Sequence, residues 1–328
     1  MKKTTLLAGA TALAATIGFS YGQTAFTTPV GYHTETCQGG GAFSVIGVNL
    51  VDAPLVSSAL TAVAGNVLTD ANVDFTASLP AGALYSVEFG NGAHSRITEM
   101  TANTITTADS VGVAVGDSYI VRKVRTLADY FGADNSAGFQ IGGADTADIL
   151  WIPDGAGFKK AYYAEAVAFL GVTEGWKLVS TGNDDQAGFP IDFTSGLIVQ
   201  RRAEAALDLT FTGHVKLTPT AVSADAPFTY ISRVYPAGST LGNSGLADSV
   251  AKGGADVASN IWMADGAGFK KGYFAEAVAF LGVTEGWKLV STGNDDQADF
   301  PLTSGVIVQR NKDAFDIMLT PPAFYADL

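Results

Sequence analysis

A long segment of this chain occurs twice, at a fixed spacing of 111 residues. Residues 154–190 and residues 265–301 align without a gap over 37 positions, and only three of these positions differ. The differences are Ala161/Gly272, Tyr163/Phe274 and Gly188/Asp299. Similarity at a fixed period indicates repeated structural units, each of which buries its apolar face against a neighbour. We therefore expect at least two modules with the same fold.

Short runs of β-forming residues fill most of the chain between turns of Gly, Asn, Asp and Pro. They are rich in Val, Ile, Tyr, Phe and Thr, as in residues 43–51, 84–89, 118–124 and 197–201. Such runs between turn residues are typical of all-β proteins. The sequence predicts an all-β fold of tandem β-sandwich or barrel-like modules, with internal duplication at the 111-residue period and short helical turns in the connections.

A fainter copy of the repeat precedes the two strong ones. Its runs occur in the same order as runs of the second unit: residues 85–89, 96–98 and 119–122 correspond to 162–165, 176–179 and 197–200. This interpretation gives three modules, of which the first has diverged and lacks tryptophan. The expected boundaries are a signal peptide at 1–22 and modules at 23–125, 126–212 and 213–328, the last with a short C-terminal tail.

Two connecting segments have helical signals. Thr126 as N-cap, Asp129 at the third helical position and Gly132 as terminator predict one helical turn. Residues 161–170 fit two structures. Their Ala, Glu and Leu residues favour a helix ended by Gly171, whereas their aromatic residues fit a strand buried on both faces. Periodicity alone does not decide between the two, and the strand is preferred.

The N-terminus has the pattern of a secretory signal peptide. Lys2 and Lys3 form a positive region, an apolar core follows over residues 6–19, and the small residues Ser20 and Gly22 precede a cleavage position. The apolar core is too short for a membrane span, so no transmembrane helix is expected after cleavage. We expect an exported protein in the periplasm, at the cell surface or outside the cell.

Composition narrows the range of partners. The net charge is −13, and removal of the two lysines of the signal peptide changes it to −15. Nucleic acid and anionic lipid are not expected as partners, because the chain lacks a Lys/Arg surface that would neutralise phosphates. The single cysteine, Cys37, rules out intramolecular disulfides and is expected to be a small buried hydrophobic residue.

Three segments carry a resemblance to a known family: residues 28–32 (TPVGY), residues 116–122 (GDSYIVR) and residues 125–132. With these in view, the chain resembles the exported, repetitive proteins of unknown function found in Verrucomicrobia and related bacteria. The resemblance extends over nearly the whole mature chain, and it implies export and a β architecture. It implies no catalytic residues, because none are established for that family.

The four tryptophans form the first group of candidate site residues. They lie 25 residues apart in each strong copy, at Trp151 and Trp176 and at Trp262 and Trp287. On a strand, Trp176 shares a face with Leu178 and alternates with Lys177, which favours a place in the core. Exposed tryptophans could instead stack on sugar rings, so carbohydrate remains an alternative ligand.

Adjacent carboxylates form the second group. Asp184 and Asp185 lie in one polar loop, and Asp295 and Asp296 lie in its copy. Calcium prefers oxygen ligands and is the one cofactor that these loops suggest. The D-x-[DN]-x-[DN]-G spacing is missing, however, and adjacent aspartates usually point apart. A solvated turn is therefore preferred. Identity of the loops reflects either recent duplication or binding at both copies.

No enzyme signature stands out, since the chain lacks a G-x-S-x-G motif and a phosphate-binding loop, and its three histidines are widely separated. The first hypothesis is a non-enzymatic structural or cell-surface protein that assembles with itself or with other envelope components. The second is a module protein that binds carbohydrate or another partner through duplicated sites. The third, an outer-membrane β-barrel, requires strands of about ten residues, and the runs here are shorter.

Export predicts that the mature chain begins at Gln23. The intact mass of the protein isolated from its native cells should equal that of residues 23–328, because signal peptidase removes the segment before the cleavage position. A chain that retains Met1, or one that is recovered from the cytoplasm, would contradict the predicted compartment.

Overall fold

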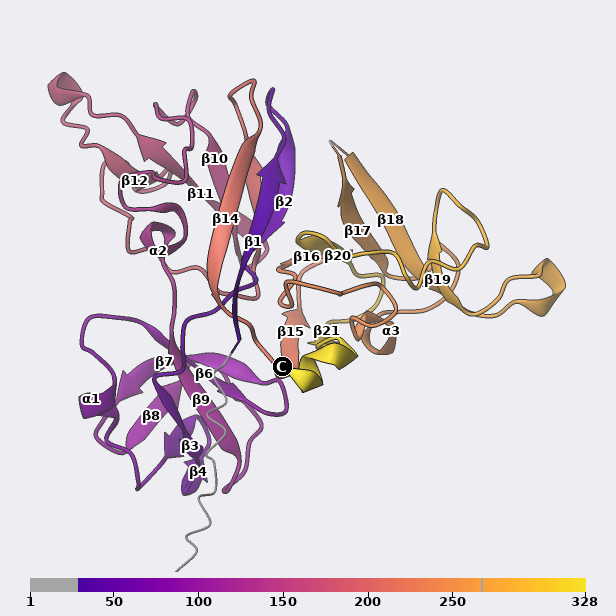
Figure 1. Cartoon of the computed structure of the whole chain (residues 1–328), viewed down its shortest axis with the longest axis horizontal. Helices are drawn as coiled ribbons and strands as arrows, with labels where there is room; N and C mark the ends of the chain where they lie inside the picture. The colour runs from indigo at the N-terminus through magenta and orange to yellow at the C-terminus, as the bar shows by residue number, and fades with distance from the viewer. Residues whose placement is uncertain (1–28, 267) are drawn as a thin grey trace, which may run out of the picture.

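The computed structural model describes residues 29–266 and 268–328, so the predicted signal peptide lies outside the described residues. Within these ranges the strands form five antiparallel sheets, and the helices are single turns in the connections (Figure 1). The predicted all-β fold with short helical turns is therefore confirmed. None of the helices described has the length and apolar character that crossing a bilayer requires.

Two separated stretches of chain, residues 30–47 and 127–214, build what we call the split module. Its main sheet has the order β12-β11-β10-β13-β2, and β1 pairs with β14 in a second sheet. Cys37 from the second sheet and Val199 from the main sheet share one core, so the core lies between the sheets. The strands are β1 (Val30–Cys37), β2 (Phe43–Gly47), β10 (Ile149–Asp154), β11 (Gly157–Ala164), β12 (Gly175–Leu178), β13 (Gly196–Gln200) and β14 (Leu207–His214).

The inserted module, residues 56–123, interrupts the split module. It is one sheet with the order β3-β9-β6-β7-β8-β5-β4. Val56 on the first of these strands and Leu68 near the opposite edge belong to one core, which requires the sheet to curl. The strands are β3 (Val56–Ala59), β4 (Ala62–Ala64), β5 (Val67–Thr69), β6 (Tyr85–Phe89), β7 (His94–Met100), β8 (Thr104–Thr107) and β9 (Ser118–Lys123).

The predicted boundary of the first module has to be corrected. A contiguous unit was expected over residues 23–125, but β1 and β2 pair with β14 and β13 of the split module. The chain leaves the split module after β2 and returns after β9. Since β3 and β9 pair with each other, the two ends of the insertion lie together.

Residues 220–319 form the C-terminal module. Its main sheet has the order β16-β20-β17-β18-β19, and β15 pairs with β21 in a second sheet. The predicted C-terminal tail contains the 3-10 helix η3 (Ala323–Asp327). The strands are β15 (Thr220–Ala224), β16 (Phe228–Ile231), β17 (Asn260–Asp265), β18 (Gly268–Ala275), β19 (Gly286–Leu289), β20 (Val306–Gln309) and β21 (Phe315–Leu319).

The same strand order occurs in all three modules. In each module, five neighbouring strands follow one pattern: the strand that comes last in the sequence lies between the strand that comes first and a hairpin. The three orders are β3-β9-β6-β7-β8, β2-β13-β10-β11-β12 and β16-β20-β17-β18-β19. One helical turn precedes each hairpin, namely α1 (Phe75–Ser78), α2 (Leu127–Phe131) and α3 (Leu246–Ser249). The expected match of residues 119–122 with 197–200 agrees with this order, since β9 has the position of β13. Residues 85–89 and 96–98 were each matched one strand too far along, with β11 and β12, whereas β6 and β7 have the positions of β10 and β11.

The two segments with helical signals differ in how far the structure agrees with the prediction. Thr126 caps α2, Asp129 completes the capping box, and Gly132 ends the helix with φ 84°, as predicted. The segment 161–170 divides: its first half is strand β11, and its second half contains the 3-10 turn η1 (Ala168–Leu170). Neither alternative for this segment holds over its whole length, because the strand needs a partner and β12 ends its pairing at Ala164.

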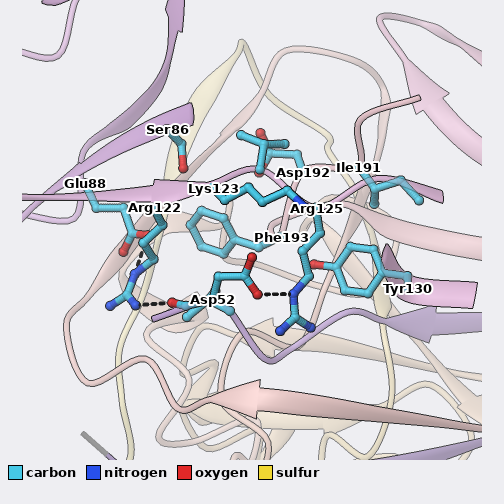
Figure 2. Close-up of a pocket in the computed structure, with 12 residues that line it drawn as sticks. Asp52, Ser86, Glu88, Arg122, Lys123, Arg125, Tyr130, Ile191, Asp192 and Phe193 are labelled. Atoms are coloured by element: carbon cyan, nitrogen blue, oxygen red, sulfur yellow. Dashed lines mark hydrogen bonds and ion pairs between the residues drawn. The ribbon is translucent and has the colours of Figure 1, made fainter. Parts of the chain in front are cut away.

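A buried group of charged side chains joins the modules. Glu88 on β6 contacts Arg122 on β9 at 3.0 Å (Figure 2) and Lys216, in the link to the C-terminal module, at 2.9 Å. All three side chains are buried. Burial lowers the pKa of Lys216, and the Glu88 carboxylate opposes this shift. Unpaired buried charges are costly, so each member of this ion cluster requires the others.

Further hydrogen bonds and one ion pair reinforce the same junction. Arg122 donates to the carbonyl of Asp52, and Arg125 pairs with the Asp52 carboxylate at 2.7 Å (Figure 2). The turn after β6 reaches the C-terminal module, where the amide of Ala221 donates to the carbonyl of Gly92 at 2.9 Å. A Cβ on Gly92 would lie 2.8 Å from the sulfur of Met318, so glycine is required for this approach.

The ion cluster predicts a large effect of Glu88→Gln. We expect the free energy of unfolding to fall by about 3 kcal/mol, because two buried cations lose their carboxylate. Urea unfolding of the full chain measures it. The matched control is Glu99→Gln on β7, whose side chain is exposed, and it should change stability by less than about 0.5 kcal/mol. Equal midpoints for the two variants would contradict the proposed importance of the cluster.

Candidate functional site

Each strong copy of the repeat projects a short tip between two strands of its main sheet. We call residues 165–174 and 276–285 the tips. In the first, Val167 and Val172 form an isolated bridge around the turn η1, and Gly171 closes the turn with φ 67°. The second is built in the same way around η2 (Ala279–Leu281). Backbone hydrogen bonds close both turns.

The tips expose large apolar side chains. Phe169 and Phe280 are each 87% exposed, and Leu170 and Leu281 are each 62% exposed. The two tips lie at opposite ends of the molecule, beyond β12 and β19 (Figure 1). Exposed apolar groups on an ordered scaffold often mark interaction sites. The tips were not among the predicted sites; the only signal was the repeated apolar run Ala-Phe-Leu before a glycine.

The split and C-terminal modules pack in a nearly symmetric way, with the edge strand of each main sheet, β2 or β16, against the second strand of the other sheet. β13 approaches β16, and the equivalent strand β20 approaches β2, which is the equivalent of β16. A Cβ on Gly196 would lie 2.8 Å from the backbone of Ile231, and a Cβ on Gly305 would lie 2.7 Å from the Ile46 carbonyl oxygen. Glycine on both sides therefore permits backbone-to-backbone contact. Each module thus contributes the same two strand positions to the contact.

Two equivalent grooves flank this interface. The wide groove, with a volume of about 740 Å³, lies between the β10–β11 turn and the segment from β15 to β16. Its apolar lining includes Pro153, Phe158, Val222, Pro227, Phe228 and Tyr230. The narrow groove, about 240 Å³, lies between the β17–β18 turn and the segment from β1 to β2, and includes polar residues such as Glu35 and Thr303. Neither groove was predicted, because each combines two modules.

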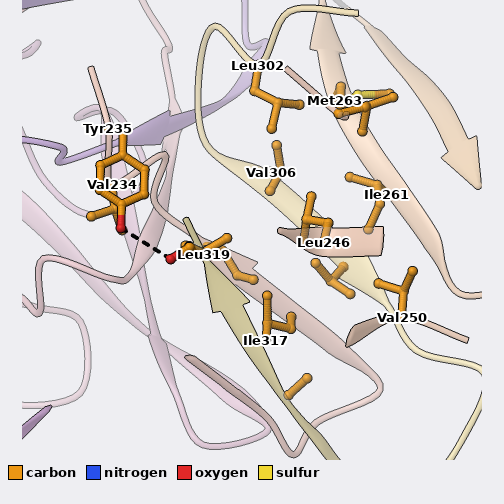
Figure 3. Packing of buried hydrophobic residues seen from close by; sticks show 14 of the residues in the cluster. Val234, Tyr235, Leu246, Val250, Ile261, Met263, Leu302, Val306, Ile317 and Leu319 are labelled. Carbon is orange, nitrogen blue, oxygen red and sulfur yellow. Dashed lines mark hydrogen bonds between the residues drawn. The ribbon is translucent and has the colours of Figure 1, made fainter. Parts of the chain in front are cut away.

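Two of the four tryptophans belong to the cores. Trp176 is 0% exposed, and Trp287 is 2% exposed within the core of the C-terminal module, part of which Figure 3 shows. Trp151 and Trp262 are half-buried, and the ammonium groups of Lys160 and Lys271 lie 3.9 Å from their ring centres. Sugar stacking needs an open ring face. The two core tryptophans offer none.

The core tryptophans differ in one contact. The indole N–H of Trp176 donates to the Gly132 carbonyl at 2.8 Å, whereas that of Trp287 is buried and has no partner among the described residues. The cause is a loop present in one copy. Leu127 precedes the start of β10 by 22 residues, but Leu246 precedes the start of β17 by only 14. The longer connection brings Gly132 over Trp176.

The aspartate loops are wrapped around buried lysines. All four candidate aspartates, Asp184, Asp185, Asp295 and Asp296, are exposed. Asp185 accepts from the Ala187 amide and Asp296 from the Ala298 amide, each at 3.1 Å. Over residues 29–266 and 268–328 there is no group of three or more His, Cys, Asp or Glu side chains able to hold a metal ion. In both copies the aspartates lie on an exposed turn.

Lys177 explains the shape of the first loop. Its Nζ is buried and donates to the Asn183 carbonyl and the Thr173 hydroxyl, both at 2.9 Å. Lys288 repeats this with Asn294 and Thr284. A buried ammonium group needs such acceptors. The two loops thus share a structural reason for their shape, which the sequence concealed because lysine on a strand is normally placed in solvent.

Comparisons with known proteins give no identification. No protein-family model, no curated protein and no solved structure matches the chain significantly. Function therefore has to be inferred from the tips and the grooves themselves.

The difference between the tryptophans can be tested with two matched substitutions. Trp176→Phe removes a hydrogen bond and leaves the Gly132 carbonyl without it, whereas Trp287→Phe removes an unpaired donor. We expect Trp176→Phe to cost about 1 kcal/mol more in free energy of unfolding. Chemical denaturation of both variants measures this. A larger loss for Trp287→Phe would show that the Gly132 contact does not stabilise the split module.

Proposed function

We propose that this protein is an exported structural protein of the cell surface that assembles with itself through its repeated β modules. Other envelope components would be further partners. The observation that carries the proposal is the pair of ordered tips, each of which presents a phenylalanine and a leucine to solvent. Full burial of one such side chain is worth about 1.5–3 kcal/mol, so contact at a tip would be strongly favoured.

The position of the tips supports assembly in more than one direction. They project from opposite ends of the molecule (Figure 1), so one molecule can contact two neighbours at once. A contact between unlike surfaces extends into a filament unless the rotation between copies closes a ring. Repetition of the tip also allows weak contacts to add up through avidity.

Charge opposes this assembly at low salt. The mature chain carries a net charge of −15 by the predicted cleavage, and exposed glutamates flank each tip: Glu165 and Glu174 on one, Glu276 and Glu285 on the other. Salt shortens the range of this repulsion from about 10 Å at 0.1 M to about 3 Å at 1 M. Burial of apolar surface does not weaken in the same way.

Assembly should therefore increase with ionic strength. Analytical ultracentrifugation of the mature chain from low to high sodium chloride measures the effect, and electron microscopy of the same samples distinguishes filaments from sheets. A parallel series with calcium at constant ionic strength tests whether the Asp184 and Asp295 loops contribute; the solvated geometry predicts no additional effect of calcium. A chain that stays monomeric under every condition contradicts self-assembly.

The alternative function is carbohydrate binding, and one observation favours it. Phe158 and Tyr230 line the wide groove with their ring centres 4.9 Å apart, and Phe228 beside them is 45% exposed. Aromatic side chains at a groove are suited to stacking on sugar rings. Affinity electrophoresis against envelope polysaccharides tests this alternative. Retardation that Phe228→Ala abolishes would favour it over assembly.

A further inference from the structure

We propose that the tip of one molecule inserts its phenylalanine and leucine into the wide groove of a second copy of the same chain. This inference rests on the proposed self-assembly and assigns the two contacting surfaces. The knob is Phe169 with Leu170, or Phe280 with Leu281 in the other tip. The hole is the wide groove between the split and C-terminal modules.

The chemistry of the groove suits an apolar knob. Phe158, Phe228 and Tyr230 contribute aromatic surface, and Pro227 and Val222 contribute aliphatic surface. Its volume of about 740 Å³ leaves room for a phenylalanine and a leucine side chain together. The narrow groove is smaller and carries the Glu35 carboxylate and several hydroxyls, so it suits an apolar side chain less well.

The occupant must come from another molecule. The wide groove lies beside β15 and β16, close to the middle of the chain's three modules, whereas the tips point outward beyond β12 and β19 (Figure 1). Both tips have the same sequence and the same turn geometry, so either can act as the knob. A molecule that accepts one tip still presents its own tips, which allows the contact to repeat.

The charge beside the tips favours a second copy over a membrane as the surface that covers them. Exposed glutamates lie at both ends of each tip. The glutamates beside each tip would be repelled by anionic headgroups. Asp225 on the groove is exposed and acidic as well, so a tip that approaches the groove meets like charge. This local repulsion adds to the expected dependence on salt.

Cysteine cross-linking in the full mature chain tests the contact. One variant, Leu170→Cys with Leu281→Cys, places a thiol on both tips and keeps their phenylalanines. The other, Ser223→Cys, places a thiol in the groove with a nearly unchanged side-chain size. The native Cys37 does not interfere, because it is fully buried and burial raises its pKa to about 12. A disulfide forms only when the two Cα atoms lie within about 7 Å.

Mixing the two variants under mild oxidation should give a disulfide-linked dimer that contains one chain of each. We expect its yield to exceed that of the control mixture, Val115→Cys with Ser223→Cys, by about tenfold or more, because a bound pair holds its thiols at a high effective concentration. Val115 is a fair control, since it is 63% exposed but lies on the inserted module. The variant Phe169→Ser with Phe280→Ser should lose assembly, and Val115→Ser should retain it.

Three results would overturn the proposal, and they have different meanings. If the wild-type chain assembles but the cross-link stays at the control level, the assignment of tip and groove is wrong while self-assembly stands. The same holds if Phe169→Ser with Phe280→Ser assembles normally. If the wild-type chain remains monomeric at every salt concentration, both the contact and the proposed function fail.

Discussion

The arrangement of the three modules depends on the buried ion cluster of Glu88, Arg122 and Lys216. Two of these residues lie on the inserted module, and the third lies on the link between the other two modules. A single buried carboxylate faces two buried cations, so its removal would leave two buried charges without their partner. This constraint fixes the inserted module against the link that leads into the C-terminal module.

Close backbone packing sets the second constraint. Gly196 and Gly305 let the edge strands β16 and β2 approach the backbone of the neighbouring module more closely than any side chain would allow. The contact is nearly symmetric, and it covers strand edges that would otherwise be open to pairing with other chains. Because the turns of both hairpins stand beside this contact, the same packing that joins the modules also forms the grooves. Each groove thus lies between the hairpin turn of one module and a segment of the other.

Both copies of the repeat expose an apolar tip to solvent. Each tip extends from a hairpin whose strands are packed in a core, and its turn is held by its own backbone hydrogen bonds. The apolar side chains are therefore presented in a fixed shape rather than collapsed against the module. An apolar knob, an apolar groove and an acidic surface around both are the physical elements of an assembly that responds to salt.

The sequence by itself determined the all-β fold, the helical turn at residues 127–131 and the near-identity of residues 154–190 and 265–301, because strand patterns, capping residues and repeats are local properties. Only the tertiary structure showed that β1 and β2 belong to the split module, because strand pairing joins residues far apart in the chain. It also decided the burial of Lys177 and the formation of the grooves. The burial of Lys177 depends on acceptors that lie before and after it in the chain. The grooves depend on how two modules meet. Neither leaves a periodic signal in the sequence.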